Sequence, residues 1–370
     1  MSETNWIADP QQLAGVAQEL TDSAWLGIDT EFLRERTFFP KLCLVQISSP
    51  RGLWLIDTLA VGDLTALVAA LTAANTRKIA HAARQDLEIL LLATREVPAP
   101  VFDTQIAAGC AGLKPQIGYA ELADTLLGVH IGKSQTRTDW SRRPLSAAQL
   151  DYAAEDVRHL PALADELRER LERLGRSAWV EQDCAVLADA ALYETAPELA
   201  WRRLKGLEQM QPRARGIAMA LAVWREKNAR ERDLPRSWIL SDAGLYALAC
   251  QAPADEAAAH RAAPECAQWR EPSRRSLLQA IAASTPAAEP AIPAEELKPT
   301  PAQKELIQRL ARVVDARAAA LGISPEILAP RGELRALAMH QGDRAALDLP
   351  SLRGWRRGQI GDELLEALKT

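Results

Sequence analysis

Two acidic side chains, one residue apart, interrupt an apolar segment near the start of this chain. Asp29 and Glu31 lie within residues 24–32, whose large apolar side chains and lack of proline predict a β-strand. Residues i and i+2 of a strand point to the same face, so the two carboxylates project side by side. A divalent cation such as Mg²⁺ or Mn²⁺ would relieve the repulsion and desolvation of such a pair. The alternative is a solvated pair on a sheet edge.

Further residues could complete such a site. Asp86 is early in a predicted helix that follows a strand, and Asp103 ends another strand. Tyr152 and Asp156 stand at i and i+4 of a predicted helix, so they share one face. Taken singly, each acid also fits a helix cap or a surface position, and the tyrosine fits a core. Together they indicate carboxylates and a phenol that converge from several elements.

The elements that must position these side chains alternate in the first part of the chain. Strands are expected at 24–32, 42–47, 53–57, 78–80 and 101–103. Helices are expected at 62–74, 85–94 and 146–174, and Ser146 with Gln149 forms a capping pair for the last. Short connections favour antiparallel pairing of the first three strands. With the β-α-β segment that follows, they predict an α/β domain, a mixed sheet flanked by helices.

Beyond the first part, the pattern is helical. The α/β domain is predicted over 1–176, and a helical connector over 177–195 leads to a helical domain over 196–283. The segment 284–299 is rich in Pro, Ala and Glu, which is typical of a linker. A second, diverged helical domain is expected over 300–370.

Composition limits the possible classes of function. The chain has 370 residues, 48% of them apolar, which suits two or three domains. It has no run of about 18 apolar residues and no signal-peptide pattern at its start, so no membrane span or secretion is expected. The five cysteines are scattered without a C-x-x-C pair. This argues against disulfides and a zinc site and favours the cytoplasm.

Charge is distributed unevenly along the chain. Residues 1–195 carry 18 Lys and Arg against 27 Asp and Glu, a net of −9. Residues 201–236 carry 10 against 4, a net of +6. A polyanion would therefore be held by a local basic patch rather than by the whole protein. A solvated helix face is the alternative.

In this order, the acids and the tyrosine resemble the DEDD-type 3′→5′ exonucleases of the tyrosine subgroup. Asp29-Thr30-Glu31 matches their first motif, Asp86 their second, and Tyr152 to Asp156 their third. The sister subgroup has histidine where this chain has Asp151. Residues 28–40 and 133–157 are similar to the ribonuclease D family, and residues 201–238 resemble an HRDC domain. Ala83 departs from the pattern, where glycine is expected before the second motif.

The resemblance implies a ribonuclease H-like fold followed by one or two HRDC bundles. It implies a hydrolase that removes nucleotides from RNA 3′ ends, chiefly those of tRNA precursors, and releases 5′-mononucleotides. The three linked units suggest a monomer. Two divalent cations, Mg²⁺ or Mn²⁺, fit phosphodiester hydrolysis. Asp29 would bridge both ions, Glu31 and Asp156 would complete one, and Asp86 would hold the other. Tyr152 would orient or deprotonate the attacking water.

RNA contacts are expected from residues around the motifs and from the basic segment. The expected set is Thr30, Phe32, Lys133, Arg137, Trp140, Arg142, Arg143, Arg202, Arg203 and Lys205. Core packing is slightly favoured for Trp140 and is the expectation for Trp201, Trp224 and Trp238. Two other functions stay open: a DNA-directed exonuclease of the same fold, and a catalytically silent RNA-binding protein.

Overall fold

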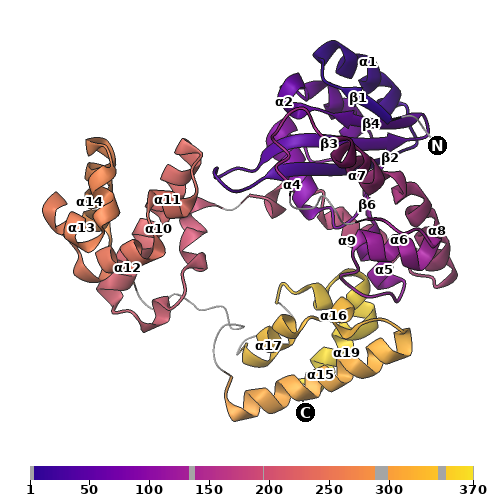
Figure 1. Ribbon diagram of the computed structural model, residues 1–370. Helices are drawn as coiled ribbons and strands as arrows, with labels where there is room; N and C mark the ends of the chain where they lie inside the picture. Colours follow the sequence, from indigo (N-terminus) through magenta and orange to yellow (C-terminus); the bar gives the residue numbers. More distant parts are fainter. Residues whose placement is uncertain (1–3, 133–137, 195, 288–298, 341–346, 370) are drawn as a thin grey trace. The chain divides into compact units, whose positions relative to one another are not determined.

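A computed structural model describes residues 4–132, 138–194, 196–287, 299–340 and 347–369 (Figure 1). By its internal contacts the chain divides into two compact units. Unit 1 comprises Met1–Leu33, Leu42–Tyr193 and Ala294–Thr370, and unit 2 comprises Arg34–Lys41 and Glu194–Pro293.

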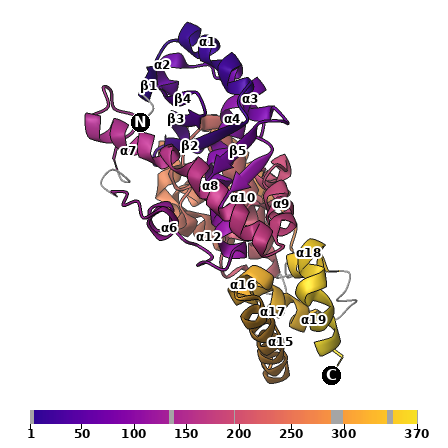
Figure 2. The same cartoon turned by 90° about the vertical axis from the view of Figure 1, so that its right-hand side faces the viewer.

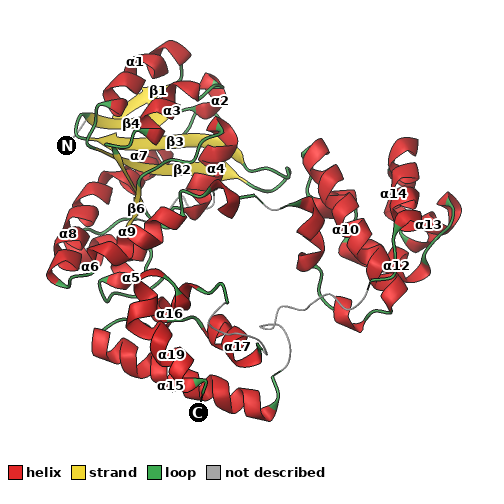
Figure 3. Cartoon of the chain, turned by 180° about the vertical axis from the view of Figure 1, so that it is seen from behind, coloured by secondary structure: helices red, strands yellow, loops and turns green. Residues whose placement is uncertain are grey.

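Unit 1 contains a six-stranded mixed sheet with the order β1-β4-β3-β2-β5-β6 (Figure 3). The strands are β1 (Thr4–Ile7), β2 (Trp25–Leu33), β3 (Lys41–Ser49), β4 (Gly52–Ile56), β5 (Arg77–Ala80) and β6 (Val101–Asp103). β3 and β4 pair antiparallel, with Ile47 opposite Trp54, whereas β5 runs parallel to β2 and β6, with Gly27 opposite Ile79. The expected mixed sheet is confirmed. The short edge strand β1 was not predicted, because most of its side chains are exposed and give no apolar pattern.

Helices cover both faces of this sheet. One face packs against helices at the start of the unit: α1 (Pro10–Thr21), α2 (Thr58–Val61), η1 (Thr65–Leu67) and α3 (Val68–Thr72). The other packs against α5 (Thr104–Cys110), α6 (Tyr119–Leu127), α7 (Ala147–Arg158), α8 (Leu160–Arg173) and α9 (Ser177–Val186). Helix α4 (Arg84–Thr94) contacts β2. Strand β2 therefore lies between two packed layers.

Two predicted helices differ from the structure. The helix expected over 146–174 is interrupted at His159, between α7 and α8, because Pro161 lies in the first turn of α8 and cannot continue the hydrogen bonding of α7. The capping box of Ser146 and Gln149 is confirmed. The helix expected over 62–74 is reduced to η1 and α3.

The C-terminal helices belong to unit 1. They are α15 (Pro301–Leu321), α16 (Pro325–Leu328), α17 (Arg331–Met339), η8 (Pro350–Leu352), α18 (Gly354–Arg356), the π-helical turn η9 (Arg357–Gly361) and α19 (Asp362–Ala367). Helix α18 lies beside α9 (Figure 2). The rings of Trp179 and Trp355 stack with centroids 4.1 Å apart, and Arg356 pairs with Asp183 at 2.6 Å. One hydrophobic core thus includes residues of both the sheet domain and the C-terminal helices.

Unit 2 is helical apart from the loop 34–41. Its elements are η3 (Pro197–Arg203), η4 (Leu207–Gln209), α10 (Pro212–Arg232), α11 (Arg236–Ile239), α12 (Asp242–Gln251), α13 (Glu256–Ala262), η5 (Pro264–Gln268) and α14 (Glu271–Ala283). Its core is centred on side chains such as Leu221, Leu245 and Leu277. Most of the expected linker lies outside the described residues, and the boundaries of separate domains stay a prediction.

The tryptophans of unit 2 correct one expectation. Trp224 is buried and Trp201 is partly buried against the core. Trp238 is instead 58% exposed, so its predicted core position is wrong. Helix α11 has only four residues, and Ile239 is the side chain that it buries. A single turn cannot direct both neighbouring side chains inward.

Candidate active site

Gly27 allows helix α7 to approach β2 closely. A Cβ atom at this position would overlap Ser48 Oγ and would lie 3.3 Å from the carbonyl oxygen of Val157. Ser48 Oγ–H donates to that carbonyl at 2.8 Å, which ties the end of α7 to β3. The two acids of β2 follow Gly27 at intervals of two and share its face. Asp156, which precedes Val157, is thereby brought over them.

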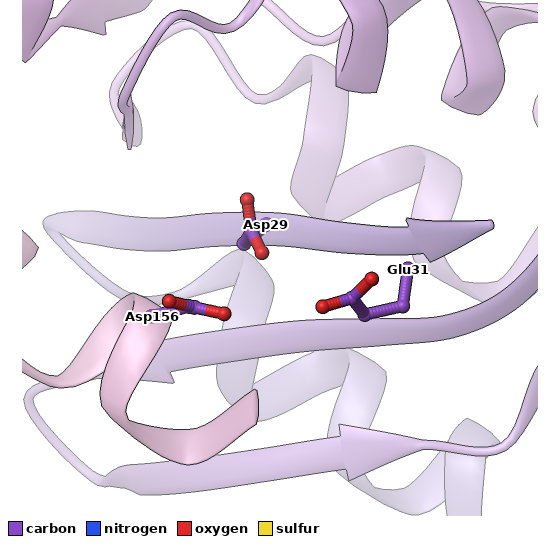
Figure 4. Close-up of side chains that lie close together, drawn as sticks. All are labelled: Asp29, Glu31 and Asp156. Atoms are coloured by element: carbon purple, nitrogen blue, oxygen red, sulfur yellow. The ribbon is translucent and has the colours of Figure 1, made fainter. Parts of the chain in front are cut away.

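Three carboxylates meet at this point. Asp29, Glu31 and Asp156 each offer one oxygen, and these oxygens lie within 4.8 Å of one another (Figure 4). Within the described ranges, this is the one group of three acids, histidines or cysteines close enough to share a metal ion. Carboxylate oxygens are the ligands that Mg²⁺ and Mn²⁺ prefer.

Burial and mutual repulsion disfavour the charged forms of these acids. Burial, followed by the charges of Asp86 and the other carboxylates, raises the pKa of Asp29 well above its usual range. The same causes raise the pKa of Glu31 to about 8. Burial is also the first cause that raises the pKa of Asp156 to about 7. Such groups become fully charged at neutral pH only beside a compensating cation, which is the environment that a divalent metal supplies.

Asp86 joins this group from helix α4. It is 9% exposed, and burial raises the pKa of its carboxyl to about 6. Thr30 Oγ–H donates to Asp86 Oδ1 at 2.5 Å. Thr30 is the middle residue of the D-x-E triplet and points to the opposite face from its neighbours. Because Thr30 is buried and its hydroxyl is bonded to Asp86, it orients that carboxylate, and its burial disfavours the predicted RNA contact of its side chain.

Tyr152 lies on α7, one turn before Asp156. Its hydroxyl forms a hydrogen bond with the Asp156 carboxyl that lowers the pKa of Asp156 in opposition to burial. The ring lies 6.1 Å from that of Trp140, centroid to centroid, at an angle of 39°. Trp140 is 2% exposed, so its indole is part of the core and offers no face to a nucleobase. It supports Tyr152 instead.

Comparison with known proteins assigns a family to this arrangement. Residues 4–172 match the family model described as a 3′-5′ exonuclease, and residues 214–263 match that of the HRDC domain. The chain is 40% identical to ribonuclease D of Gluconacetobacter diazotrophicus, covering 98% of this chain and 92% of that relative. It is 34% identical to ribonuclease D of Pseudomonas paraeruginosa, and this match covers 100% of this chain and 98% of that relative. The chain belongs to the ribonuclease D family.

A solved structure supports the assignment. The crystal structure of Escherichia coli RNase D, an exoribonuclease involved in structured RNA processing, matches with a TM-score of 0.85 and 27% identity over 99% of both chains. This member of the family is therefore a 3′→5′ exoribonuclease, a hydrolase that acts on RNA. Its exonuclease domain is of the type that uses divalent metals. Among the described residues, no helix is both long and apolar enough to span a membrane.

The sequence alone does not reveal which residues support Asp86, the second motif. Asp103 accepts hydrogen bonds from the N–H groups of Ala82 and Ala83 at 3.0 and 2.8 Å, and from Gln105 N–H at 2.8 Å. It thus caps α5 and also fixes the turn that leads into α4. Ala82 adopts a φ of +54°, which an alanine keeps only when its surroundings impose it. Asp103 therefore positions Asp86, and the unexpected Ala83 is buried at the start of the helix.

The basic residues of unit 1 that are expected to contact RNA differ in their exposure and in their partners. Lys133 and Arg137 lie outside the described residues. Arg142 is exposed and pairs with Asp139 at 3.2 Å. Arg143 makes two 2.7 Å hydrogen bonds to the Asp57 carboxylate and donates at 2.8 Å to each of three backbone carbonyls, those of Cys43, Trp140 and Arg142. The N–H groups of its guanidinium donate to partners inside the protein, which disfavours the predicted contact with an RNA phosphate.

The remaining expected contacts are Phe32 on β2 and three basic residues of unit 2. Phe32 is partly exposed at the end of the strand that carries the acids. Arg202 lies 5.7 Å from the ring of Trp201, and Lys205 is exposed. Arg203 lies 3.6 Å from the buried carboxylate of Glu226. These four residues stay candidates.

Proposed function

We propose that this protein removes nucleotides from RNA 3′ ends by hydrolysis with two divalent cations and releases 5′-mononucleotides. The observation that carries the proposal is the convergence of Asp29, Glu31 and Asp156 within 4.8 Å, with Asp86 beside them. The raised pKa values support a cation site, because carboxyl groups in this environment are stabilised when a metal compensates their charge.

The roles of the acids follow from their places in the cluster. The charges of all three other carboxylates raise the pKa of Asp29, so Asp29 is the residue best placed to contact both ions. Glu31 and Asp156 would share one ion with it, and Asp86, held by Thr30, would take part in holding the other. When bound, such ions neutralise the phosphoryl oxygens, provide a nucleophile at neutral pH and stabilise the leaving 3′-oxygen.

Tyr152 has a positioning role in this proposal. A phenol has an unperturbed pKa of about 10, so at neutral pH it keeps its proton and acts as a hydrogen-bond partner. Its hydroxyl bonds to Asp156, which places it at the edge of the carboxylate cluster. From there it can orient the attacking water toward the phosphorus, while the packing of Trp140 limits movement of the ring.

For the substrate we propose structured RNAs with a single-stranded 3′ tail, chiefly tRNA precursors. The similar Escherichia coli enzyme is described as acting in structured RNA processing, which supports this class. We also propose a monomer located in the cytoplasm. All five cysteines are free thiols, which suits a reducing compartment. Light scattering would test the monomer.

The first prediction tests this function with the variant Asp29→Asn. The protein is incubated with Mg²⁺ and a tRNA transcript that carries extra 3′ nucleotides, and mononucleotide release is measured. We expect a chelator to stop the reaction and Asp29→Asn to lower kcat more than about 100-fold, because ligand loss exceeds the 10–100-fold cost of losing an outer partner. RNA binding should persist.

Asp151→Asn is the matched control, since this exposed acid is on the same helix next to Tyr152 but outside the cluster. It should behave as the wild type. Full activity of Asp29→Asn would contradict the proposal. Preferred degradation of a DNA strand of the same sequence would favour a DNA-directed enzyme, and RNA binding without nucleotide release would favour a silent binding protein.

A further inference from the structure

Gln46 is a buried amide on β3 that forms no hydrogen bond. Its side chain is 0% exposed, and within the described part of the chain neither its amide oxygen nor its amide nitrogen has a partner. Burying an unbonded amide is costly, and nearly all buried polar side chains in proteins are hydrogen-bonded. A methionine or a leucine would fill a similar volume without this cost. The amide therefore indicates a role other than packing.

Gln46 faces the side of the sheet on which the acids meet. Side chains 46 and 48 point to the same face, because successive residues of a strand alternate. Ser48 Oγ–H donates to the Val157 carbonyl, so this face is the one that α7 covers. Leu55, which pairs with Gln46 across β4, belongs to the same core as Val157. Gln46 thus points toward α7, the helix that carries the third motif.

The register of β3 on β2 places Gln46 beside Asp29. The two strands are neighbours in the sheet, and the segment 34–40 that joins them is too short for a parallel crossover, so they run antiparallel. Ser48 Oγ would overlap a Cβ atom on Gly27, which makes these two residues cross-strand neighbours. Two residues further along each strand, in opposite directions, stand Gln46 and Asp29. Their side chains therefore share one face as a cross-strand pair.

Two acids of the cluster already have a side chain that orients them. Asp86 accepts a hydrogen bond from the Thr30 hydroxyl, and Asp156 is bonded to the Tyr152 hydroxyl. The hydrogen bond that lowers the pKa of Asp29 comes instead from the backbone of Thr30. Carboxylates that bind metals are commonly hydrogen-bonded by outer partners, which orient them. The unbonded amide on β3 has donors for this role at the central ligand.

We propose that Gln46 is a positioning residue of the metal site, and that its amide N–H donates to the Asp29 carboxylate when a divalent cation is bound. An amide suits this place because it donates hydrogen bonds without carrying charge. A lysine or arginine here would pair with the acids and compete with the cation. The inference rests on the proposed two-cation hydrolysis and adds a residue from β3 to the elements that form the site.

The test compares Mn²⁺ binding by the full-length wild type, Gln46→Met and Gln46→Leu without RNA. Isothermal titration calorimetry on metal-free protein gives Kd for Mn²⁺. We expect both substitutions to raise this Kd about 10–100-fold, the usual effect of losing an outer partner of a ligand. The unfolding temperature of the metal-free variants should equal or exceed that of the wild type, because an apolar side chain replaces an unbonded buried amide.

Ser351→Ala is the matched control. Ser351 is also fully buried, and its hydroxyl likewise has no partner among the described residues, but it lies in η8 and outside the carboxylate cluster. This variant should bind Mn²⁺ as the wild type does. In RNA hydrolysis, Gln46→Met should lower kcat at limiting Mn²⁺ and leave KM for RNA unchanged. Excess Mn²⁺ should restore most of kcat, which a merely structural defect would not allow.

The outcomes separate this inference from the proposed function. Wild-type Mn²⁺ binding together with an unchanged Kd in both Gln46 variants would overturn the positioning role alone. A loss of stability in the metal-free variants, with no loss of Mn²⁺ affinity in the folded fraction, would also overturn it. A wild type that binds no Mn²⁺ would instead refute the two-cation function. Asp29→Asn, which removes a ligand, should weaken Mn²⁺ binding more than either Gln46 variant.

Discussion

At the scale of single residues, the carboxylate cluster binds protons that a metal must displace. Glu31, Asp156 and Asp86 have pKa values of about 8, 7 and 6, with burial as the first cause in each case. In an unfolded chain these values are about 4. At pH values between about 4 and about 8, the folded, metal-free protein therefore binds more protons than the unfolded chain. Its stability is therefore greatest at low pH within this window and is lost as pH rises through the folded pKa values.

The second prediction concerns pH and metal removal. With a chelator, the unfolding temperature should fall as pH rises from about 5 to about 8, by roughly 5 °C or more. Added Mg²⁺ should raise it, and more at pH 8 than at pH 5, because metal ligands must lose their protons. Differential scanning calorimetry at several pH values measures both effects.

Glu31→Gln should flatten the pH dependence, because it removes a carboxyl group whose pKa is raised to about 8, whereas Asp151→Asn should leave it unchanged. A metal-free protein whose stability is independent of pH across this window would show that the four acids do not form a buried cluster in solution.

Single residues also show what the sequence can predict. The shared face of Asp29 and Glu31 follows from strand alternation alone, and the shared face of Tyr152 and Asp156 from helical periodicity. The bond between Thr30 and Asp86 depends on which helix packs against the opposite face of β2, and no local pattern encodes this. The burial of Arg176, Arg215 and Arg225 and the exposure of Trp238 also depend on how distant segments pack, so the local sequence does not predict them.

At the scale of elements, the distance between β2 and α7 determines whether Asp156 reaches the acids of the strand. The third prediction is that Gly27→Ala destabilises the protein by about 1–3 kcal/mol, because the added methyl overlaps Ser48 Oγ and presses on the end of α7. Activity should fall as well, since Asp156 moves. Urea denaturation and kcat measure the two effects.

A second substitution makes this prediction specific. Ser48→Ala in the Gly27→Ala protein removes the overlapping oxygen and should recover part of the loss, a coupling that a double-mutant cycle detects. Gly15→Ala is the control, because no atom lies within 4 Å of a Cβ there. It should be neutral or stabilising, as alanine is in a helix. Additive effects of the two substitutions would contradict the packing argument.

The helices illustrate a second limit of sequence interpretation. Apolar periodicity predicted one helix over 146–174, although Pro161 was a visible sign of the break at His159. The pattern continues in phase across the break because both segments pack on the same face of the sheet. Periodicity reports the buried face, whereas the interruption is a backbone property that only the proline reveals.

At the scale of the whole molecule, the C-terminal helices share a core with the exonuclease sheet. Trp355 stacks on Trp179, and Arg356 makes hydrogen bonds of 2.6 and 2.8 Å to the two carboxylate oxygens of Asp183. Cys184, on the same helix α9, accepts a hydrogen bond from Asp103 N–H at 3.3 Å. A continuous set of contacts thus runs from the C-terminal helices to the residue that positions Asp86.

The fourth prediction is that Trp355→Ala lowers the free energy of unfolding by about 3–5 kcal/mol, the usual cost of removing a buried aromatic ring. The loss of packing against α9 should also lower nuclease activity. Chemical denaturation measures the first effect and mononucleotide release the second. Trp6→Ala serves as a control at an exposed position. Equal stability of both variants would show that the C-terminal helices are dispensable for the core.

The stacking of Trp179 and Trp355 also has a consequence for biosynthesis. The ribosome makes α9 well before it makes α18. When the nascent exonuclease domain leaves the exit tunnel, the Trp179 indole and the Asp183 carboxylate therefore do not yet contact Trp355 and Arg356. Helix α18, which is translated later, completes this contact. A nuclease built in this way completes its core only after elongation has passed α18, so its newly made exonuclease domain stays incompletely packed while it is still close to the RNA of the ribosome.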